Sequence, residues 1–252
     1  MPRSLQIAKT FSMHQPHFLP WLPYFAKLAS ASKFVVMDNV QYRRYYYQAR
    51  TRVRVSIRSD ETRWLILPVR SSTRLLIRDI KLAGRNPLER VKKDLTNTYQ
   101  RAPHFASTWP TIEQALSVPH SDLLQVNIAL LHAVFSLLDI APPCFHLSSD
   151  LTWSQNRELR IAEAARVLDA TLLLVGWGGS STAHDQKALH EHGVTMVHVS
   201  PTRMLAECRN THTGLTILDT IFLRGPAYTA GIIENASRMF HDAVATFDRT
   251  IL

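Results

Sequence analysis

A proline-bounded loop near the amino terminus decides the fold of this chain. Its sequence is Met13-His14-Gln15-Pro16-His17-Phe18-Leu19-Pro20-Trp21. Residues 6–12 before it predict a strand, residues 21–31 predict a helix, and residues 33–38 (Lys-Phe-Val-Val-Met-Asp) predict a second strand. In a strand, helix, strand unit of this kind, the loop that leaves the first strand faces the ligand. We therefore expect the active surface at this loop.

An antiparallel hairpin is expected after the second strand. Residues 53–57 alternate apolar and polar side chains, a polar turn follows at 59–61, and a further apolar run spans 64–69. A separate strand is expected at 75–82.

Helices and buried strands alternate in the remainder of the chain. Asn86 is expected to cap a helix that has Pro87 in its first turn. We expect further helices up to about residue 140 and at 157–168, 185–192, 215–222 and 231–247, with strands at 145–147, 171–175 and 194–199. The predicted fold class is α/β, with a largely parallel central sheet flanked by helices and an antiparallel hairpin extension. A chain of 252 residues is of a size that α/β folds build as one unit, so we expect a single domain, residues 1–252.

The composition limits the class of protein. With 46% hydrophobic and 19% charged residues, the chain is unlike a disordered protein. The apolar run 126–140 contains four polar residues and is too short to span a bilayer, and residues 1–6 carry no secretion signal, so we expect a cytoplasmic protein without a transmembrane segment. Cys144 and Cys208 are too few for a disulfide framework. The formal charge of +9 favours anionic partners.

One block of the sequence carries a specific pattern: His-Gln-Pro, Leu-Pro-Trp, Tyr-Phe, an Asp that ends a strand, Val-Gln-Tyr and finally Arg-x-Arg. These positions are His14, Gln15, Pro16, Leu19, Pro20, Trp21, Tyr24, Phe25, Asp38, Val40, Gln41, Tyr42, Gln48, Arg50 and Arg52. In this pattern the chain resembles the WbqC-like family, and weaker matches extend over nearly the whole sequence. The chain departs from the family in having Asn39 after Asp38 where a paired acid is usual, and in having Ala49 and Thr51 where asparagines are usual. These departures affect which substrate the chain would take.

The resemblance implies a role in the biosynthesis of O-antigen, other polysaccharides or small molecules, by transfer of glycine or another acyl group to an amino group. The implied partners are an anionic activated donor, such as aminoacyl-tRNA, acyl-CoA or a nucleotide, and an amine acceptor. No tightly bound cofactor is expected.

His14 and Asp38 are the candidate catalytic residues. His14 and His17 follow a buried strand, where a neutral imidazole can act as a general base or hold a phosphate, although either could be a hydrogen-bonded structural histidine. No third or fourth ligand lies at a recognisable spacing, so no metal site is predicted. Asp38 can orient an amine, take a proton or coordinate magnesium, or it can simply cap the following turn.

Residues 41–52 interleave arginine with tyrosine, a pattern in which guanidinium groups bind phosphates and rings stack on bases or sugars. A solvated basic hairpin is the alternative. The glycine-rich run 176–182 could cradle an anion or form a plain turn, and the serine pair at 148–149 could bind ligand or cap a helix. The candidate substrate-binding residues are Gln15, Tyr24, Gln41, Tyr42, Arg50, Arg52, Ser148, Ser149, Gly176 and Gly178.

Three functions remain open at the level of sequence. The first is an amide-forming transferase, in which His14 or Asp38 deprotonates the acceptor amine while Arg50 and Arg52 hold the donor. The second is a nucleotidyltransferase-like enzyme that uses ATP, because a histidine-bearing loop after a first strand is typical of such enzymes. The third is a non-catalytic RNA-binding module, favoured by the charge and by the arginine and tyrosine segment. No activated-nucleophile signature is present, which argues against covalent catalysis.

Overall fold

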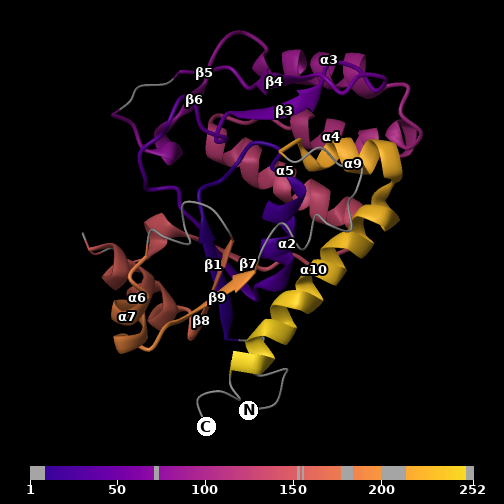
Figure 1. Cartoon of the computed structure of the whole chain (residues 1–252). Coiled ribbons are helices and arrows are strands. Elements are labelled where there is room, and N and C mark those ends of the chain that lie inside the picture. Colours follow the sequence, from indigo (N-terminus) through magenta and orange to yellow (C-terminus); the bar gives the residue numbers. More distant parts are fainter. Residues whose placement is uncertain are drawn as a thin grey trace.

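The structure is a computed structural model that describes residues 9–70, 74–151, 154, 156–176, 184–199 and 214–247. Within these residues the central sheet has five strands in the order β7–β2–β1–β8–β9 (Figure 1). Their bounds are β1 Thr10–His14, β2 Lys33–Val36, β7 Cys144–Leu147, β8 Leu172–Gly176 and β9 Thr195–Val199. Each neighbouring pair is parallel. This confirms the α/β class, and it confirms that the two strands around the proline-bounded loop are neighbours.

Helices cover both faces of this sheet. Alternate side chains of a strand point to opposite faces, so Phe11 and Leu173 pack on one side and Phe34 and Leu174 on the other. The first face is covered by α6 (Arg157–Val167) and α7 (Gln186–Glu191), and the second by α2 (Leu22–Ser30), α5 (Leu123–Leu138) and α10 (Pro226–Phe247). The long helix α10 packs against both α2 and the edge strand β9 (Figure 1).

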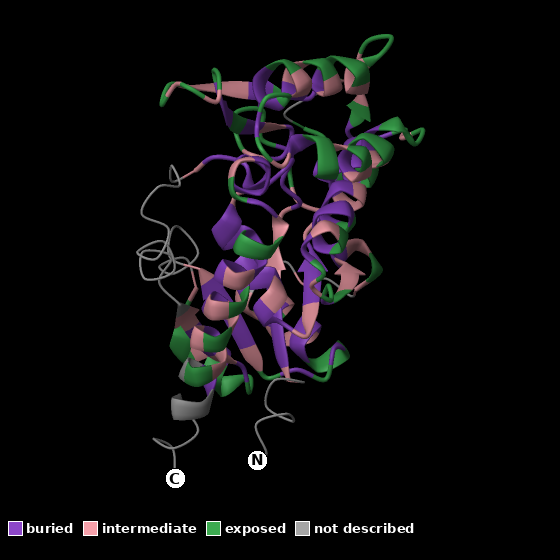
Figure 2. Ribbon diagram, turned by 90° about the vertical axis from the view of Figure 1, so that its right-hand side faces the viewer, coloured by how far each residue is buried: buried purple, intermediate pink, exposed green. Residues whose placement is uncertain are grey.

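A second group of elements lies beyond the carboxyl ends of the strands (Figure 1). It comprises β3 (Arg50–Arg54), β4 (Thr62–Ile66), β5 (Val69–Arg70), β6 (Lys81–Leu82), α3 (Pro87–Tyr99), α4 (Phe105–Ser117) and α9 (Ile217–Arg224). One hydrophobic cluster contains both Phe34 of the sheet and Leu65 of the hairpin. Buried residues accordingly extend from the central sheet into this second group (Figure 2). We call it the hairpin part.

The expected hairpin is present as β3 and β4, which pair antiparallel. Its first strand ends at Arg54, short of the expected Ile57, because the chain turns at residues 56–59, where the Ser59 amide donates to the Ser56 carbonyl oxygen. The hairpin forms a two-stranded sheet of its own and is not hydrogen bonded to the central sheet.

The strand expected at 75–82 is wrong for most of its length. Leu76 forms one isolated bridge with Gln41, Ile77–Asp79 is a 3-10 helix, and only Lys81–Leu82 is a strand, paired with β5. The buried residues Ile77 and Ile80 are three apart, which is the period of a 3-10 turn and not of a strand.

Two helix ends also differ from expectation. The side chain of Asn86 makes no capping hydrogen bond, although α3 begins at Pro87 as expected. The last helix begins at Pro226, five residues before the expected Gly231, because proline suits the first turn of a helix. Of the first expected strand, residues 6–8 lie outside the described residues, and β1 continues to His14.

The 3-10 helix Ser148–Asp150 follows β7 directly. Among the described helices, none combines the length and apolar character needed to cross a bilayer.

Candidate functional site

The carboxyl ends of the sheet strands bring several predicted site residues to one edge. His14 ends β1, Asp38 follows β2, Ser148 follows β7 and Gly176 ends β8. The strand order places β1 and β8 side by side, and the chain leaves these two strands toward opposite faces, through α2 and α7. Ligands of doubly wound sheets bind at such a switch point, outside the carboxyl ends of the strands.

His14 and Tyr24 are both anchored to the main chain of Gln15. His14 Nδ1 lies 3.0 Å from the Gln15 carbonyl oxygen, and the Tyr24 hydroxyl donates to the same oxygen at 3.0 Å. Because a carbonyl oxygen can only accept, Nδ1 of His14 carries the proton and Nε2 has the free lone pair. Among the described residues nothing bonds to this Nε2, and the side chain is partly exposed. His14 is therefore held in the form that a general base requires.

A chain of rings connects His14 with the hairpin. The ring of His17 lies 4.6 Å from that of His14 and stacks on Tyr24 at 5.1 Å and on Tyr47 at 5.5 Å between centroids. Tyr47 in turn lies 5.6 Å from Trp64. The loop after β1 and the arginine and tyrosine segment therefore form one continuous packed surface.

Arg50 and Arg52 of β3 lie on the same face of the hairpin as Trp64 of β4. The guanidinium carbon of Arg50 lies 3.9 Å from the Trp64 ring centroid and that of Arg52 lies 5.7 Å from it. Arg50 also donates to the Tyr45 carbonyl oxygen, whereas its Nε is buried without a partner among the described residues. Tyr45 itself is 74% exposed. Arg50 is thus oriented by aromatic stacking, with one hydrogen-bond donor unused.

Gln15 is linked to the same segment through Gln48. Gln48 Nε2 donates to Gln15 Oε1 at 2.7 Å, and Gln48 Oε1 accepts from the Arg43 amide at 2.7 Å. The buried Asn127 of α5 donates to the carbonyl oxygens of Pro16 and Gln48. These contacts fix the loop against the hairpin part.

Asp38 is buried and is bonded to the serine pair. Its Oδ1 lies 2.8 Å from Ser148 Oγ and accepts from the Ser149 amide at 2.9 Å. The Met37 amide donates to the His14 carbonyl oxygen, so this group adjoins the end of β1. The structure thus brings together Asp38 and two serines that lie 110 and 111 residues away in sequence.

The remaining predicted residues are placed as follows. Gln41 pairs with Leu76, and Tyr42 is buried beneath the same segment, where burial raises its pKa. Gly176 is the last residue of β8, at the carboxyl edge of the sheet, and Gly178 lies outside the described residues. From the sequence we predict that five of the predicted site residues converge on one cleft, and this stays a prediction: His14, Gln15, Asp38, Arg50 and Arg52.

Lys27 is a residue of this region that sequence reasoning missed. It lies on α2 one turn after Tyr24, is only 7% exposed, and has its ammonium group 6.0 Å from the centre of the Tyr24 ring. Burial lowers the pKa of Lys27 to about 7. The signal was available, since Lys27 is the only charged side chain in the otherwise apolar and small-residue run Leu22–Ser30.

Burial, together with repulsion by Lys27, lowers the pKa of both histidines, that of His17 to about 3 and that of His14 well below 6.5. Burial raises the pKa of Tyr24. Both imidazoles are therefore neutral at pH 7. Strongly shifted ionisable groups gathered at a ligand-facing edge are typical of functional sites.

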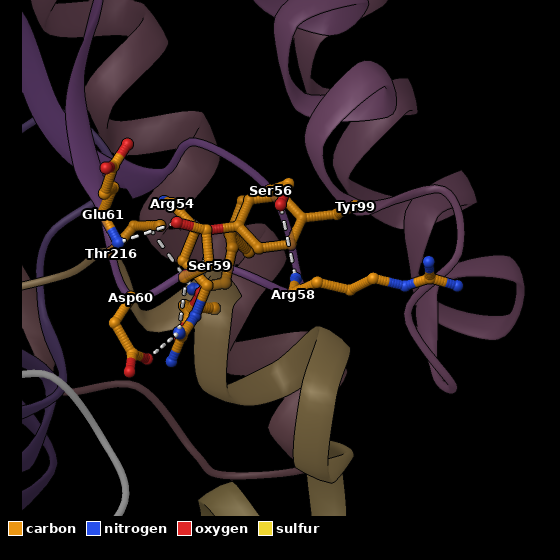
Figure 3. A network of polar contacts seen from close by, with 10 residues as sticks. Arg54, Ser56, Arg58, Ser59, Asp60, Glu61, Tyr99 and Thr216 are labelled. Carbon is orange, nitrogen blue, oxygen red and sulfur yellow. Dashed lines mark hydrogen bonds and ion pairs between the residues drawn. The ribbon is translucent and has the colours of Figure 1, made fainter.

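The third arginine of β3 has a different environment. Arg54 Nε donates to Asp219 Oδ1 at 2.9 Å, the Tyr99 hydroxyl donates to the same oxygen at 2.9 Å, and Arg54 Nη1 lies 3.2 Å from Asp60 (Figure 3). This buried cation is paired with Asp219 and Asp60 and joins the hairpin to α9, while the Tyr99 hydroxyl adds α3, which indicates a structural role.

Comparison with known proteins agrees with the pattern in the loop. The WbqC-like protein family matches residues 15–230. An uncharacterized protein of Mycobacterium tuberculosis, Rv1507c, is 26% identical over 171 residues, which cover 67% of this chain and 72% of that protein. No solved structure matches the chain. Because the family match runs from Gln15 of the loop through the hairpin and four of the five central strands, and so covers most of the chain, the chain belongs to the WbqC-like protein family.

Proposed function

We propose that this protein is an amide-forming transferase, which moves glycine or a related aminoacyl or acyl group from an activated, anionic donor to an amino group in polysaccharide or small-molecule biosynthesis. The observation that carries the proposal is His14 at the carboxyl edge of the sheet, with Nδ1 held by the Gln15 carbonyl oxygen and Nε2 unpaired among the described residues. The biosynthetic role implied by the family resemblance supports it.

In the proposed reaction His14 acts as the general base. The acceptor nitrogen attacks the acyl carbon of the donor, the new C–N bond forms, and Nε2 of His14 takes the proton that the nitrogen loses. The bond between the acyl carbon and the leaving group breaks, and the leaving group departs with the electron pair. The proton on His14 then passes to the leaving group or to solvent.

The electrostatics of the site match an anionic donor. A pKa far below neutrality keeps His14 unprotonated but also makes it a weak base. A negative charge beside the ring would raise this pKa towards neutrality, because it favours the charged imidazolium. In this proposal donor binding therefore strengthens the base at the moment when it is needed.

Arg50 and Arg52 are proposed to hold the donor. Trp64 fixes the plane of the Arg50 guanidinium group, whose two terminal nitrogens would face the donor. A planar guanidinium fork pairs well with phosphate oxygens. Asp38, which already accepts hydrogen bonds from the serine pair, is proposed to position the end of β2 beside His14.

The test is a search for an acylated amine. Purified protein would be incubated with an amine acceptor and, in turn, aminoacyl-tRNA, acyl-CoA, or amino acid with ATP, and the products would be analysed by mass spectrometry. We expect a mass increase of one acyl group on the acceptor with one class of donor. Absence of any acylated amine with all three classes would refute the proposal.

A second function, nucleotidyl transfer, is favoured by one observation. Counted along the chain, the central strands have the order 3-2-1-4-5, which is typical of sheets that bind nucleotides at the switch point. Release of pyrophosphate from ATP, with no acyl group transferred to any amine, would select this function over the first.

A further inference from the structure

Three nitrogen-bearing side chains surround the ring of Tyr24. The ring centroids of His14 and His17 lie 5.0 Å and 5.1 Å from that of Tyr24, and the Lys27 ammonium group lies 6.0 Å from it. We call these four residues the His–Lys cluster. We call its two buried nitrogen-bearing residues, Lys27 and His17, which are only 7% and 5% exposed, the inner members.

The inner members have no counter-ion. In the described part of the chain, burial is the only influence on the pKa of the Lys27 ammonium group and no acidic group acts on it. His17 Nε2 is buried without a partner among the same residues. By contrast, Arg54, which among the described residues is the other buried Lys or Arg, is paired with Asp219. An unpaired buried charge is strongly unfavourable, so its persistence in a ligand-facing region indicates a role in binding.

The elements packed against α2 supply no neutralising group among their described residues. Strand β8 carries no titratable side chain, and His241 of α10 is bound to the carbonyl oxygen of Ser30. The other titratable side chains described on α10 are exposed: Tyr228, Glu234, Arg238 and Asp242. Burial alone lowers the pKa of Lys27, and Lys27 in turn lowers the pKa of His14 and His17, which add no negative charge beside it.

We propose that Lys27 and His17 form a subsite for a phosphoryl oxyanion, which the ammonium group neutralises and to which Nε2–H of His17 donates. The donors present are the three N–H groups of an ammonium ion and one imidazole N–H, and a tetrahedral phosphoryl group offers enough oxygens for them. A cation is excluded by the charge of Lys27, and no described group of acidic, histidine or cysteine side chains has the arrangement of a metal site.

The subsite lies beside the proposed base. His14 contacts both His17 and Tyr24, so a phosphoryl group held by Lys27 would present the rest of its ligand to His14. The use of this subsite in catalysis rests on the proposed function, and it makes the donor a phosphate-bearing molecule. Binding itself does not require acyl transfer and can be measured without it.

Proton uptake is the specific signature of the subsite. The pKa of Lys27 lies at about 7 in the free protein, so at pH 8 most of the side chains are neutral. A bound anion raises this pKa, and Lys27 must then take a proton from the buffer. Simple surface binding of phosphate would take up no proton at this pH.

The experiment is titration calorimetry at pH 8 in two buffers of different ionisation enthalpy. Inorganic phosphate and AMP are the probes, which distinguish a free from an esterified phosphate, and acetate is the carboxylate probe. We expect the wild-type protein to bind phosphate or AMP with uptake of a large fraction of a proton. Lys27→Met should bind at least about 10-fold more weakly, as for loss of a charge-assisted contact, and without proton uptake.

Two further variants complete the test. Lys93→Met removes the same charge from an exposed position on α3 and should bind as the wild-type protein does. His17→Phe keeps a ring between Tyr24 and Tyr47 but removes the donor, and should weaken binding several-fold. The inference is overturned if neither phosphate nor AMP binds, if Lys27→Met binds like Lys93→Met, or if acetate binds as tightly as phosphate. If the protein binds phosphate in this way but transfers no acyl group, the subsite is supported and the proposed function is refuted.

Discussion

Arg50 and Arg52 alternate along one strand, and both are expected to weaken donor binding when replaced by alanine. Each substitution removes a charge-assisted contact of roughly 1.5–3 kcal/mol, which is about one to two decades in affinity. Lysine at either position should recover only part of the loss, because a point charge cannot reproduce the fork. The matched control is Arg58→Ala, since Arg58 is exposed and points away from Arg54 and Asp60 (Figure 3). Donor titrations that gave equal losses for all three alanine variants would indicate general electrostatics in place of specific contacts.

Lys27 is expected to lower the stability of the fold, so Lys27→Met should raise it. The pKa of Lys27 falls from 10.5 to about 7 on folding, so between these values the unfolded chain binds more protons and stability rises with pH. Replacement by an apolar side chain should add roughly 1–4 kcal/mol at pH 7 and remove this rise between pH 7 and 10. Urea denaturation at pH 7 and pH 9.5 measures both effects, with Lys93→Met as the control. A variant less stable than wild type at pH 7 would show that Lys27 has a structural partner.

At the residue scale, the sequence predicted those site residues whose position along the chain forms a recognisable local pattern. His14 was selected by its place after a buried strand, and Arg50 by its alternation with rings. Gln48 and Asn127 received no role, because their importance comes from hydrogen bonds to main-chain atoms that are distant in sequence. Such partners are fixed only when the hairpin part packs against the loop.

At the scale of elements, the junction between α9 and α10 depends on Gly225. Its φ is +89°, and a β-carbon there would lie 2.9 Å from the His104 ring. We expect Gly225→Ala to destabilise the fold by roughly 1–3 kcal/mol, through backbone strain and the displaced ring.

The matched control for this junction is Gly231→Ala within α10, where a β-carbon meets nothing within 4 Å. Alanine is the better helix former, so this variant should be more stable by about 0.5–1 kcal/mol. Thermal unfolding of both variants measures the two opposite changes. A similar sign for the two would contradict the account of the junction.

The sequence predicted helices and strands correctly where the spacing of apolar residues matched a single kind of element. The parallel strands are short apolar runs with turn signals on both sides, and β1, β2 and β8 were placed to within two residues of their carboxyl ends. The segment 75–82 failed because its apolar residues pack under α5 through a 3-10 turn, and local alternation does not report that contact. The early start of α10 is not evident from the sequence, because Gly231 is typical of a helix boundary but lies inside the helix.

At the scale of the whole molecule, the candidate site lies where the carboxyl edge of the sheet meets the hairpin part (Figure 1). The Phe18 amide donates to the Tyr47 carbonyl oxygen, and the Thr51 hydroxyl donates to the Leu19 carbonyl oxygen. The loop after β1 is thus fixed from both sides, by its own strand and by the hairpin. The sequence predicted the sheet and the hairpin separately, but not this contact, because no local pattern records packing between elements 30 residues apart.

The central claim is that His14 acts on the reaction while Arg50 and Arg52 act on the binding of the donor. Single-turnover acyl transfer, measured as a function of donor concentration, gives the rate of the chemical step and the donor affinity from one data set. We predict that His14→Ala lowers the rate by about 100-fold or more with little change in affinity, while the arginine variants do the reverse. A His14→Ala protein that retained a near-normal rate would contradict the account and transfer the role of base to Asp38.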